Sequence, residues 1–117
     1  MTSNTNVELA QKYFELSNNR DLDGIEQILT DSTTYSSPNV GVFLGVEQIM
    51  EMKHKFYGSF REMSWQVNIA NEIRPGVVEF DFVFKGTTCK GEIIERPGIE
   101  YVIVKDGKLQ HIEVRNK

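Results

Sequence analysis

The apolar positions in the N-terminal half of the chain recur at helical spacing. In residues 5–17, Ala10, Tyr13 and Phe14 follow the i, i+3, i+4 pattern that places side chains on one face of a helix. We expect this helix to end at Asn18-Asn19-Arg20, because asparagine tolerates the left-handed conformation that is common at helix C-termini. An amphipathic first helix is therefore predicted.

Two further segments show the same periodicity. Residues 22–29 form a short apolar stripe after Asp21, whose carboxylate can accept a hydrogen bond from the free N–H groups at a helix start. Residues 45–58 repeat apolar positions at helical spacing and end on a glycine, a residue that often terminates helices. Three helices are predicted in all.

Beyond residue 60 the pattern changes to alternation of apolar and polar positions, which is typical of strands with one covered face. Residues 63–69 and 78–84 alternate in this way on either side of a Pro-Gly turn, and they predict a hairpin. Residues 99–104 and 109–114 are joined by Asp-Gly, a strong hairpin signal. Four strands of one sheet are therefore expected.

Two segments are harder to interpret from the pattern. Residues 33–36 have the β-branched and aromatic content of a strand, and Pro38 should end it, since proline lacks the N–H that a central ladder requires. A loop is expected between this strand and the third helix. Residues 86–97 are less regular, with a short strand at Ile93-Ile94 as the most that the pattern suggests.

Helices followed by strands predict an α+β fold, in which a strongly curved, mostly antiparallel sheet wraps over three helices and leaves a pocket between them. The strand at residues 99–104 is apolar on both faces, with Ile99, Tyr101 and Ile103 on one side and Val102 and Val104 on the other. The helices can cover only the concave face. We therefore expect the convex face to meet a second copy of the chain in a homodimer.

Composition narrows the class of protein. The 117 residues fit one domain, expected to span residues 1–117, and a net charge of −4 with scattered basic residues disfavours nucleic-acid partners. No apolar run is long enough to span a bilayer, so no membrane association is expected. A single cysteine, Cys89, and a polar start without the features of a signal peptide indicate cytoplasmic residence.

Four segments in order carry a family resemblance: Tyr13 to Asp21-Leu22-Asp23-Gly24-Ile25, Leu29-Thr30-Asp31, Gly45-Val46-Glu47-Gln48-Ile49, and Asp106-Gly107-Lys108-Leu109. Together with the order of elements, they resemble the nuclear transport factor 2-like superfamily, which includes ketosteroid isomerases and SnoaL-like polyketide cyclases. The resemblance covers nearly the whole chain. It implies a cystatin-like cone around a mostly apolar pocket, usually in a homodimer.

The resemblance also implies roles for individual residues. Tyr13 matches the tyrosine that donates a hydrogen bond to the substrate oxyanion in ketosteroid isomerases, and Glu100 falls near their oxyanion-hole acid, so both are candidate catalytic residues. A carboxylic acid kept protonated in an apolar site can donate such a bond, as the oxyanion-hole acid of ketosteroid isomerases does. The general-base aspartate corresponds to Ser37, which is neither basic nor anionic near neutral pH.

The side chains expected to line the ligand pocket combine these positions with aromatic and aliphatic residues of the helices and strands: Tyr13, Phe14, Ser37, Phe56, Trp65, Phe82, Glu100, Val102, Ile112 and Val114. His111 and Glu113 share one face of a strand and are either an acid–base pair or part of a solvated face. With two histidines and one cysteine in the chain, no metal site is expected, and no cofactor motif is present.

Three functions remain open from the sequence. The first is a SnoaL-like binding protein or degenerate enzyme with an apolar pocket for a small apolar or carbonyl-bearing ligand. The second is an isomerase or polyketide cyclase-type enzyme that acts by acid/base chemistry, and the third is a protein-interaction domain. If the protein is an enzyme, we expect an acid with a strongly shifted pKa in the cavity, and if it is a binding protein, an apolar cavity without such an acid. If it is an interaction domain, we expect a cavity filled by side chains.

Overall fold

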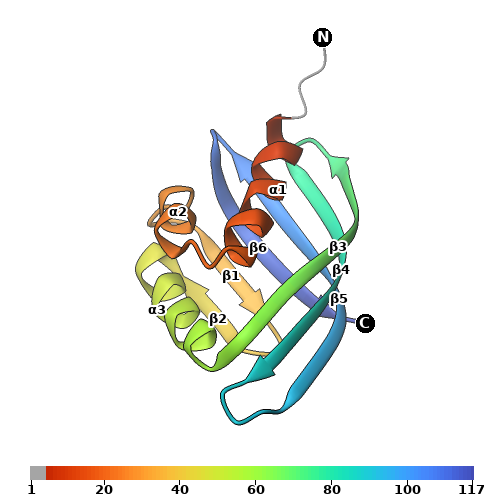
Figure 1. Ribbon diagram of the computed structural model, residues 1–117. Coiled ribbons are helices and arrows are strands. Elements are labelled where there is room, and N and C mark those ends of the chain that lie inside the picture. The colour runs from red at the N-terminus through yellow and green to blue at the C-terminus, as the bar shows by residue number, and fades with distance from the viewer. Residues whose placement is uncertain (1–4) are drawn as a thin grey trace.

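The computed structural model describes residues 5–117, in which helices occupy the concave side of one curved sheet (Figure 1). The helices are α1 (Thr5–Asn18), α2 (Leu22–Gln27) and α3 (Gly45–Gly58). The strands are β1 (Thr34–Ser37), β2 (Gly41–Leu44), β3 (Phe60–Arg74), β4 (Val77–Thr88), β5 (Ile93–Lys105) and β6 (Lys108–Asn116). Residues 1–4, which include most of the polar start, lie outside the described residues.

The strands form a six-stranded sheet in the order β2-β1-β6-β5-β4-β3. All neighbouring pairs are antiparallel except β1 and β6, which run parallel. Helix α1 packs against β3, β4 and β5, while α3 contacts β1, β2 and the start of β3. The predicted α+β fold, with three helices on a strongly curved and mostly antiparallel sheet, is confirmed.

The helix boundaries follow from local chemistry. Asp21 caps α2 as predicted, because its carboxylate accepts a hydrogen bond of 2.9 Å from the Gly24 N–H. The left-handed residue after α1 is Arg20, with φ of 56°, and not one of the asparagines. Its guanidinium donates to the carbonyls of Tyr57 at 3.2 Å and Phe60 at 2.7 Å. The end of α1 is thereby joined to the corner between α3 and β3.

The expected loop before α3 contains a strand. Residues Gly41–Leu44 form β2 and pair with β1, with Ser37 opposite Gly41 and Thr34 opposite Leu44. Val42 and Leu44 are exposed, so no alternation of apolar and polar positions marks this edge strand. The hairpin depends on backbone pairing, which the side-chain pattern does not reveal.

Strand β5 is longer than predicted and runs without a break through Arg96-Pro97-Gly98. The Pro97 carbonyl accepts a hydrogen bond from Lys117 N–H, on the side that faces the end of β6. In an antiparallel strand the nitrogen and carbonyl of one residue point to the same side, so proline removes no bond to β4. This position tolerates proline inside a central strand.

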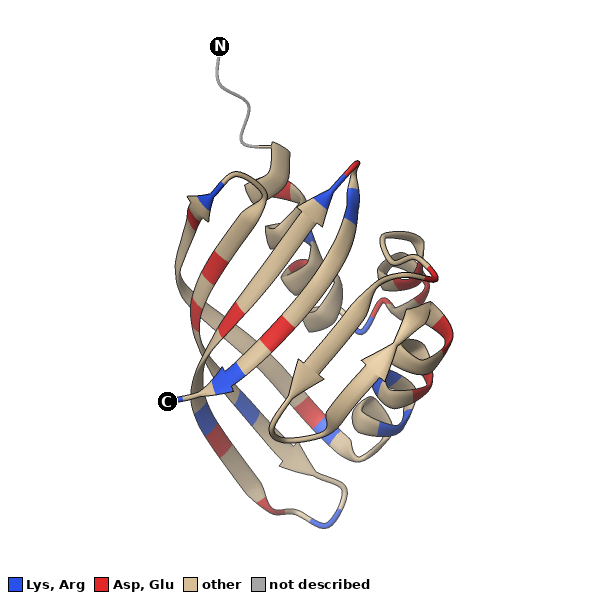
Figure 2. Ribbon diagram, turned by 180° about the vertical axis from the view of Figure 1, so that it is seen from behind, with Lys and Arg blue, Asp and Glu red and all other residues tan. Residues whose placement is uncertain are grey.

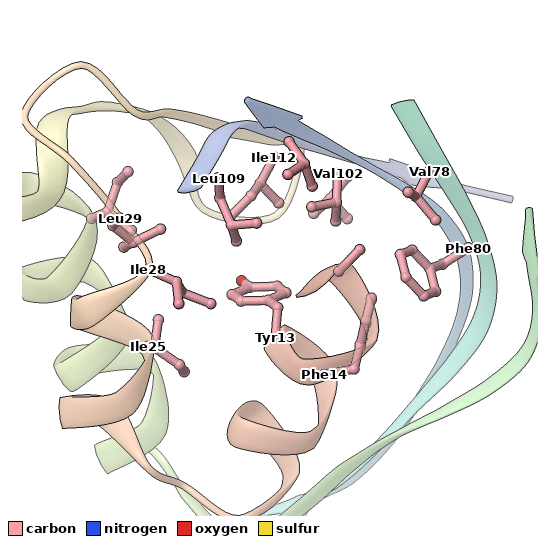
Figure 3. Packing of buried hydrophobic residues seen from close by; sticks show 14 of the residues in the cluster. Tyr13, Phe14, Ile25, Ile28, Leu29, Val78, Phe80, Val102, Leu109 and Ile112 are labelled. Atoms are coloured by element: carbon pink, nitrogen blue, oxygen red, sulfur yellow. The ribbon is translucent and has the colours of Figure 1, made fainter. Parts of the chain in front are cut away.

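The core lies between α1 and the middle of the sheet (Figure 3). Phe14 packs on Phe80 with ring centroids 4.5 Å apart, and Val102 and Ile112 are fully buried beside them. Burying side chains of this size contributes roughly 1.5–3 kcal/mol each, so this cluster anchors α1 on β4 and β5. The anchoring also determines where the neighbouring Tyr13 side chain lies.

Candidate functional site

A cavity of about 60 Å³ lies between α1, α3 and the concave face of the sheet. Aromatic side chains form a continuous part of its wall, with Phe14 from α1, Phe56 from α3, Trp65 from β3, and Phe82 and Phe84 from β4. Ring centroids of neighbouring members of this wall are 5.0–6.3 Å apart. Polar side chains in such surroundings are desolvated, and their chemistry is correspondingly altered.

Helix α1 presents Tyr13 to this cavity because the residue belongs to the buried face of the helix, which packs on the sheet. The Tyr13 side chain is 3% exposed, and its hydroxyl accepts a hydrogen bond of 2.5 Å from Lys53 Nζ. One turn later, the Ser17 hydroxyl donates to the Tyr13 carbonyl at 2.8 Å. Burial raises the pKa of Tyr13 well above its usual value, so the phenol is neutral at physiological pH.

Lys53 comes from the buried face of α3 and is 4% exposed. Its Nζ lies 4.8 Å from the ring centroid of Tyr13 and 5.1 Å from that of Tyr35. Burial lowers the pKa of Lys53 to about 8, although the negative charge of Glu100 opposes this shift. The amine therefore gives up its proton much more readily than a surface lysine does.

Glu100 enters the cavity from β5, where it pairs with Phe80 on one side and Val114 on the other. Its side chain is 3% exposed and has no hydrogen bond to any residue of the described chain, 5–117. Burial raises its pKa to about 7, and the positive charge of Lys53 counteracts part of the rise. No direct ion pair within 4.0 Å joins the two groups in this described part.

A further hydroxyl, buried in the wall of the cavity, lacks a partner. Tyr57, one turn after Lys53 on α3, is 5% exposed, and its hydroxyl oxygen makes no hydrogen bond within the described residues. Burial raises its pKa to about 12, so it is also a neutral phenol. Glu100 thus presents a carboxyl without a protein hydrogen bond to a largely apolar cavity, while the Tyr57 oxygen is buried in the cavity wall. A polar group at an apolar cavity is the arrangement of a binding site for a polar atom of a ligand.

The structure brings together most of the residues expected in the pocket. Eight of them line the cavity: Tyr13, Phe14, Ser37, Phe56, Trp65, Phe82, Glu100 and Val114. Val102 and Ile112 instead lie in the core beside it and do not line the cavity. At the end of β1, the Ser37 hydroxyl accepts a hydrogen bond from the Asn39 N–H at 3.1 Å. That contact holds the hydroxyl at the cavity wall.

Sequence reasoning missed Lys53 and Tyr57, the two polar groups that α3 contributes. A signal for Lys53 was present, since it lies four residues after Ile49 and three before Phe56, in the middle of the buried stripe. A lysine at that position of an amphipathic helix departs from the usual exposure of lysine. The departure indicates a functional side chain.

His111 and Glu113 lie on the convex face of the sheet, away from the cavity, while the alternate residues Ile112 and Val114 point inward. His111 Nε2 is 2.9 Å from Glu113 Oε1, and Thr34 Oγ1 is 2.6 Å from Nδ1. Hydrogen bonding from His111 holds the pKa of Glu113 below its usual range. This pair is part of the outer face.

Residues 5–117 contain neither a cluster of metal-ligating side chains nor a membrane-spanning helix. No three His, Cys, Asp or Glu side chains are grouped so that they could hold a metal ion. In the same part of the chain, no helix has the length and apolar character needed to cross a membrane.

Backbone contacts place Trp65 at the cavity. The Asn18 side chain donates to the Trp65 carbonyl at 3.0 Å and accepts from the Trp65 N–H at 2.7 Å. The tryptophan backbone on β3 is therefore joined to the end of α1, and its ring packs 5.0 Å from Phe84. As the one tryptophan of the chain, Trp65 reports on the cavity.

Comparison with known families decides the classification. Residues 10–112 match the SnoaL-like domain family. The chain belongs to this family. No match was found among curated proteins. The nuclear transport factor 2-like and cystatin-like fold that the sequence predicts for this SnoaL-like domain is confirmed by solved structures.

Three of these structures illustrate the likeness. TerC, crystallised with polyporic acid, is 18% identical, with a TM-score of 0.83 over 97% of this SnoaL-like domain and 92% of that chain. A candidate polyketide cyclase from Xanthomonas campestris pv. campestris is 16% identical, with a TM-score of 0.86 over 97% of this chain and 90% of that one. A hypothetical protein from Catenulispora acidiphila with a ketosteroid isomerase-like fold, in complex with trimethylamine, is 12% identical, with a TM-score of 0.84 over 94% and 85%. At these identities the likeness shows the fold.

The two shifted pKa values imply a specific dependence of stability on pH. Glu100 has a folded pKa raised to about 7, so its stabilising contribution is complete below its unfolded value of 4.5 and is lost as the pH rises through 7. Lys53 has a folded pKa lowered to about 8, so its contribution is present above 10.5 and is lost as the pH falls through 8. We expect the combined contribution of the two groups to be lowest between these folded pKa values.

Urea unfolding across this pH range measures the effect. Glu100→Gln should flatten the acidic limb, and Lys53→Met should flatten the alkaline limb, each by at most about 1.4 kcal/mol per pH unit for one proton. Glu26→Gln, at an exposed position of α2, serves as the control and should leave both limbs unchanged. An acidic limb that is the same in Glu100→Gln and wild type would contradict the assignment to Glu100.

Proposed function

We propose that this SnoaL-like domain binds a small, largely apolar molecule whose oxygen atom or atoms contact the polar groups of the cavity. The observation that carries the proposal is the buried Glu100 carboxyl, which faces the cavity without a protein hydrogen bond. A hydrogen bond between this carboxyl and a ligand hydroxyl or carbonyl would contribute about 0.5–1.5 kcal/mol net. The Tyr57 hydroxyl, buried in the cavity wall, is a second group without a protein hydrogen bond.

The size of the cavity limits the ligand. A water molecule needs roughly 10–15 Å³ of cavity volume. A cavity of about 60 Å³ therefore has room for a ligand of about the size of a single ring. Val40, Met52 and Phe56 separate the cavity from a neighbouring, more open hollow that they also line. Because methionine is flexible, movement of Met52 would admit a larger ring. A steroid does not fit without such rearrangement.

Solved structures of this fold support the proposal. TerC was crystallised with polyporic acid, and the Catenulispora acidiphila protein was determined in complex with trimethylamine. Both are small molecules held by proteins whose chains overlay most of this one. A protein-interaction domain is supported less well, because it was expected to have a cavity filled by side chains.

Binding of phenol tests the proposal. The indole N–H signal of Trp65 in a ¹⁵N NMR spectrum belongs to the single tryptophan, so its shift on titration reports occupancy of the cavity. We expect phenol to bind more tightly than toluene, which has the same shape and no hydroxyl. Tyr13→Phe and Tyr57→Phe should each weaken phenol binding by about 2- to 10-fold, the value of one net hydrogen bond.

Tyr57→Phe gives a second readout that a structural tyrosine would not. Removing an unbonded buried hydroxyl should raise the free energy of unfolding of the free protein while weakening phenol binding. Tyr101→Phe, on the convex face and outside the cavity, is the matched control for binding and should leave the phenol affinity unchanged. Equal affinity for phenol and toluene in wild type would show that the polar groups do not select the ligand.

A cavity carboxyl with a strongly shifted pKa was expected of an enzyme and not of a simple binding protein, and Glu100 is such a group. It favours a second function, an isomerase or cyclase-type enzyme that works by acid/base chemistry. A carboxyl with a pKa of about 7 in a cavity is suited to take and return a proton near neutral pH. Tyr13 and Lys53 lie together where they could donate to a carbonyl oxygen that gains negative charge. Glu100 would then replace the base that is absent at Ser37.

Exchange of the methyl protons of acetone in D₂O tests this second function, since exchange requires removal of a proton next to a carbonyl. We expect wild-type protein to accelerate the exchange and Glu100→Gln to lose about 10²-fold of that acceleration, as is typical for loss of a general base. Glu79→Gln is the control. An exchange rate equal to that of protein-free buffer would leave a binding protein without this activity.

We also propose that the domain acts as a homodimer through the convex face. The outward residues Ile99, Tyr101 and Ile103 are half-buried on that face, opposite the helices. Acidic and basic positions are interspersed along the strands (Figure 2), which does not favour a nucleic-acid partner. The lone exposed Cys89 fits a reducing compartment, and we place the protein in the cytoplasm.

Light scattering measures the oligomeric state directly. We expect a mass twice that of the 13.4 kDa chain, and Ile103→Glu should return it to one chain because it adds a charge to the centre of the apolar face. Ile93→Glu is the control, since Ile93 is 84% exposed near the turn before β5. A single-chain mass for wild type at micromolar concentration would overturn the dimer.

A further inference from the structure

Lys53 differs from every other lysine of the described residues. It is 4% exposed, whereas the others are exposed. Its Nζ makes one hydrogen bond, to the Tyr13 hydroxyl, and it borders the cavity between aromatic rings. A buried amine with access to a cavity is the arrangement that activates lysine as a nucleophile toward carbonyl compounds.

We propose that Lys53 forms an imine with a small aldehyde or unhindered ketone bound in the cavity. The inference rests on the proposed binding function and adds to it a class of ligand, carbonyl compounds, and a covalent step. It uses groups on three separate elements: the amine from α3, the phenol from α1 and the carboxyl from β5.

The step balances without an oxidant or reductant. The lone pair of the neutral Lys53 amine forms a bond to the carbonyl carbon, and the π electrons of the C=O bond move to oxygen, which takes a proton. The nitrogen then loses a proton, and the oxygen, protonated again, departs as water while the C=N bond forms. The products are one imine and one water molecule.

The neighbours of Lys53 supply what this step requires. The Tyr13 hydroxyl, 2.5 Å from Nζ, fixes the direction of the amine toward the cavity. The Glu100 carboxyl faces the same cavity, has no competing protein hydrogen bond, and can carry the proton to the departing oxygen. The aromatic wall of Phe56, Trp65 and Phe84 limits water, which would otherwise hydrolyse the imine.

The protonation state agrees with this geometry. A lysine with a pKa of about 8 is neutral in roughly one molecule in ten at pH 7, whereas an exposed lysine near 10.4 is neutral in far fewer than one in a hundred. The Glu100 carboxyl, with a pKa of about 7, is present in both its acid and its base form at that pH. Both forms are used in carbinolamine formation and dehydration.

Reductive trapping with butanal and sodium cyanoborohydride at pH 7 tests the inference. The reagent reduces an imine to a stable secondary amine, and peptide mapping by mass spectrometry locates it. We expect Lys53 to be alkylated at least about 10-fold faster than Lys55, which lies on the exposed side of the same helix. Phenol, as a competing ligand, should slow the labelling of Lys53 and leave that of Lys55 unchanged.

Two variants separate imine formation by the Lys53 amine from the contribution of this side chain to folding. Lys53→Arg keeps a cation in the cavity but cannot form the imine, and Lys53→Met replaces it with an apolar chain of similar length. Both should lose the fast-labelled peptide, whereas Lys55→Met should retain it. Should either Lys53 variant fail to fold, the rates for Lys53 and Lys55 within wild type still decide the outcome.

The indole signal of Trp65 distinguishes failure of this inference from failure of the proposed function. Butanal and its alcohol, butan-1-ol, should both shift that signal, because both enter the cavity. If they do so while Lys53 is labelled no faster than Lys55, the imine is excluded and binding stands. If neither they nor phenol shift the signal, the proposed binding function fails together with the inference.

Discussion

The site depends on the burial of two groups of opposite charge in one apolar cavity. Lys53 and Glu100 are each less than 5% exposed, and no direct ion pair joins them in the described chain. Burial disfavours both charges, and each charge favours the other, so their pKa values come to lie near neutrality. The fold must hold the two side chains at this separation, and the packing of α1 and α3 on the sheet does so.

Much of the fold could be predicted from the sequence, because its signals are local and periodic. The helical stripes, the Asp21 cap and the alternation in the long strands each follow from one element's own residues. Strand β2 could not be predicted, since its backbone pairing leaves no pattern of burial. The continuity of β5 through Pro97 could not be predicted either, because it depends on the position of the end of β6 beside Pro97.

The site was predicted less completely, because it depends on contacts between elements and not on the pattern within one element. Tyr13 and Glu100 were found through a family resemblance, and their inward direction depends on helix phase and strand parity, which the structure supplies. Lys53 and Tyr57 had no counterpart in that resemblance, although the position of Lys53 inside an apolar stripe was visible. Contacts between α1, α3 and β5 join residues 40 or more positions apart, such as Tyr13 and Lys53.

The pair of hydrogen bonds between the Asn18 side chain and the Trp65 backbone has a consequence for solubility. Strand β3 is one of the two edges of the sheet, and such edges can recruit strands from other molecules and start aggregation. The Asn18 amide occupies both the donor and the acceptor of Trp65, as a neighbouring strand would. One helix-terminal side chain thus shields the middle of this edge from intermolecular pairing.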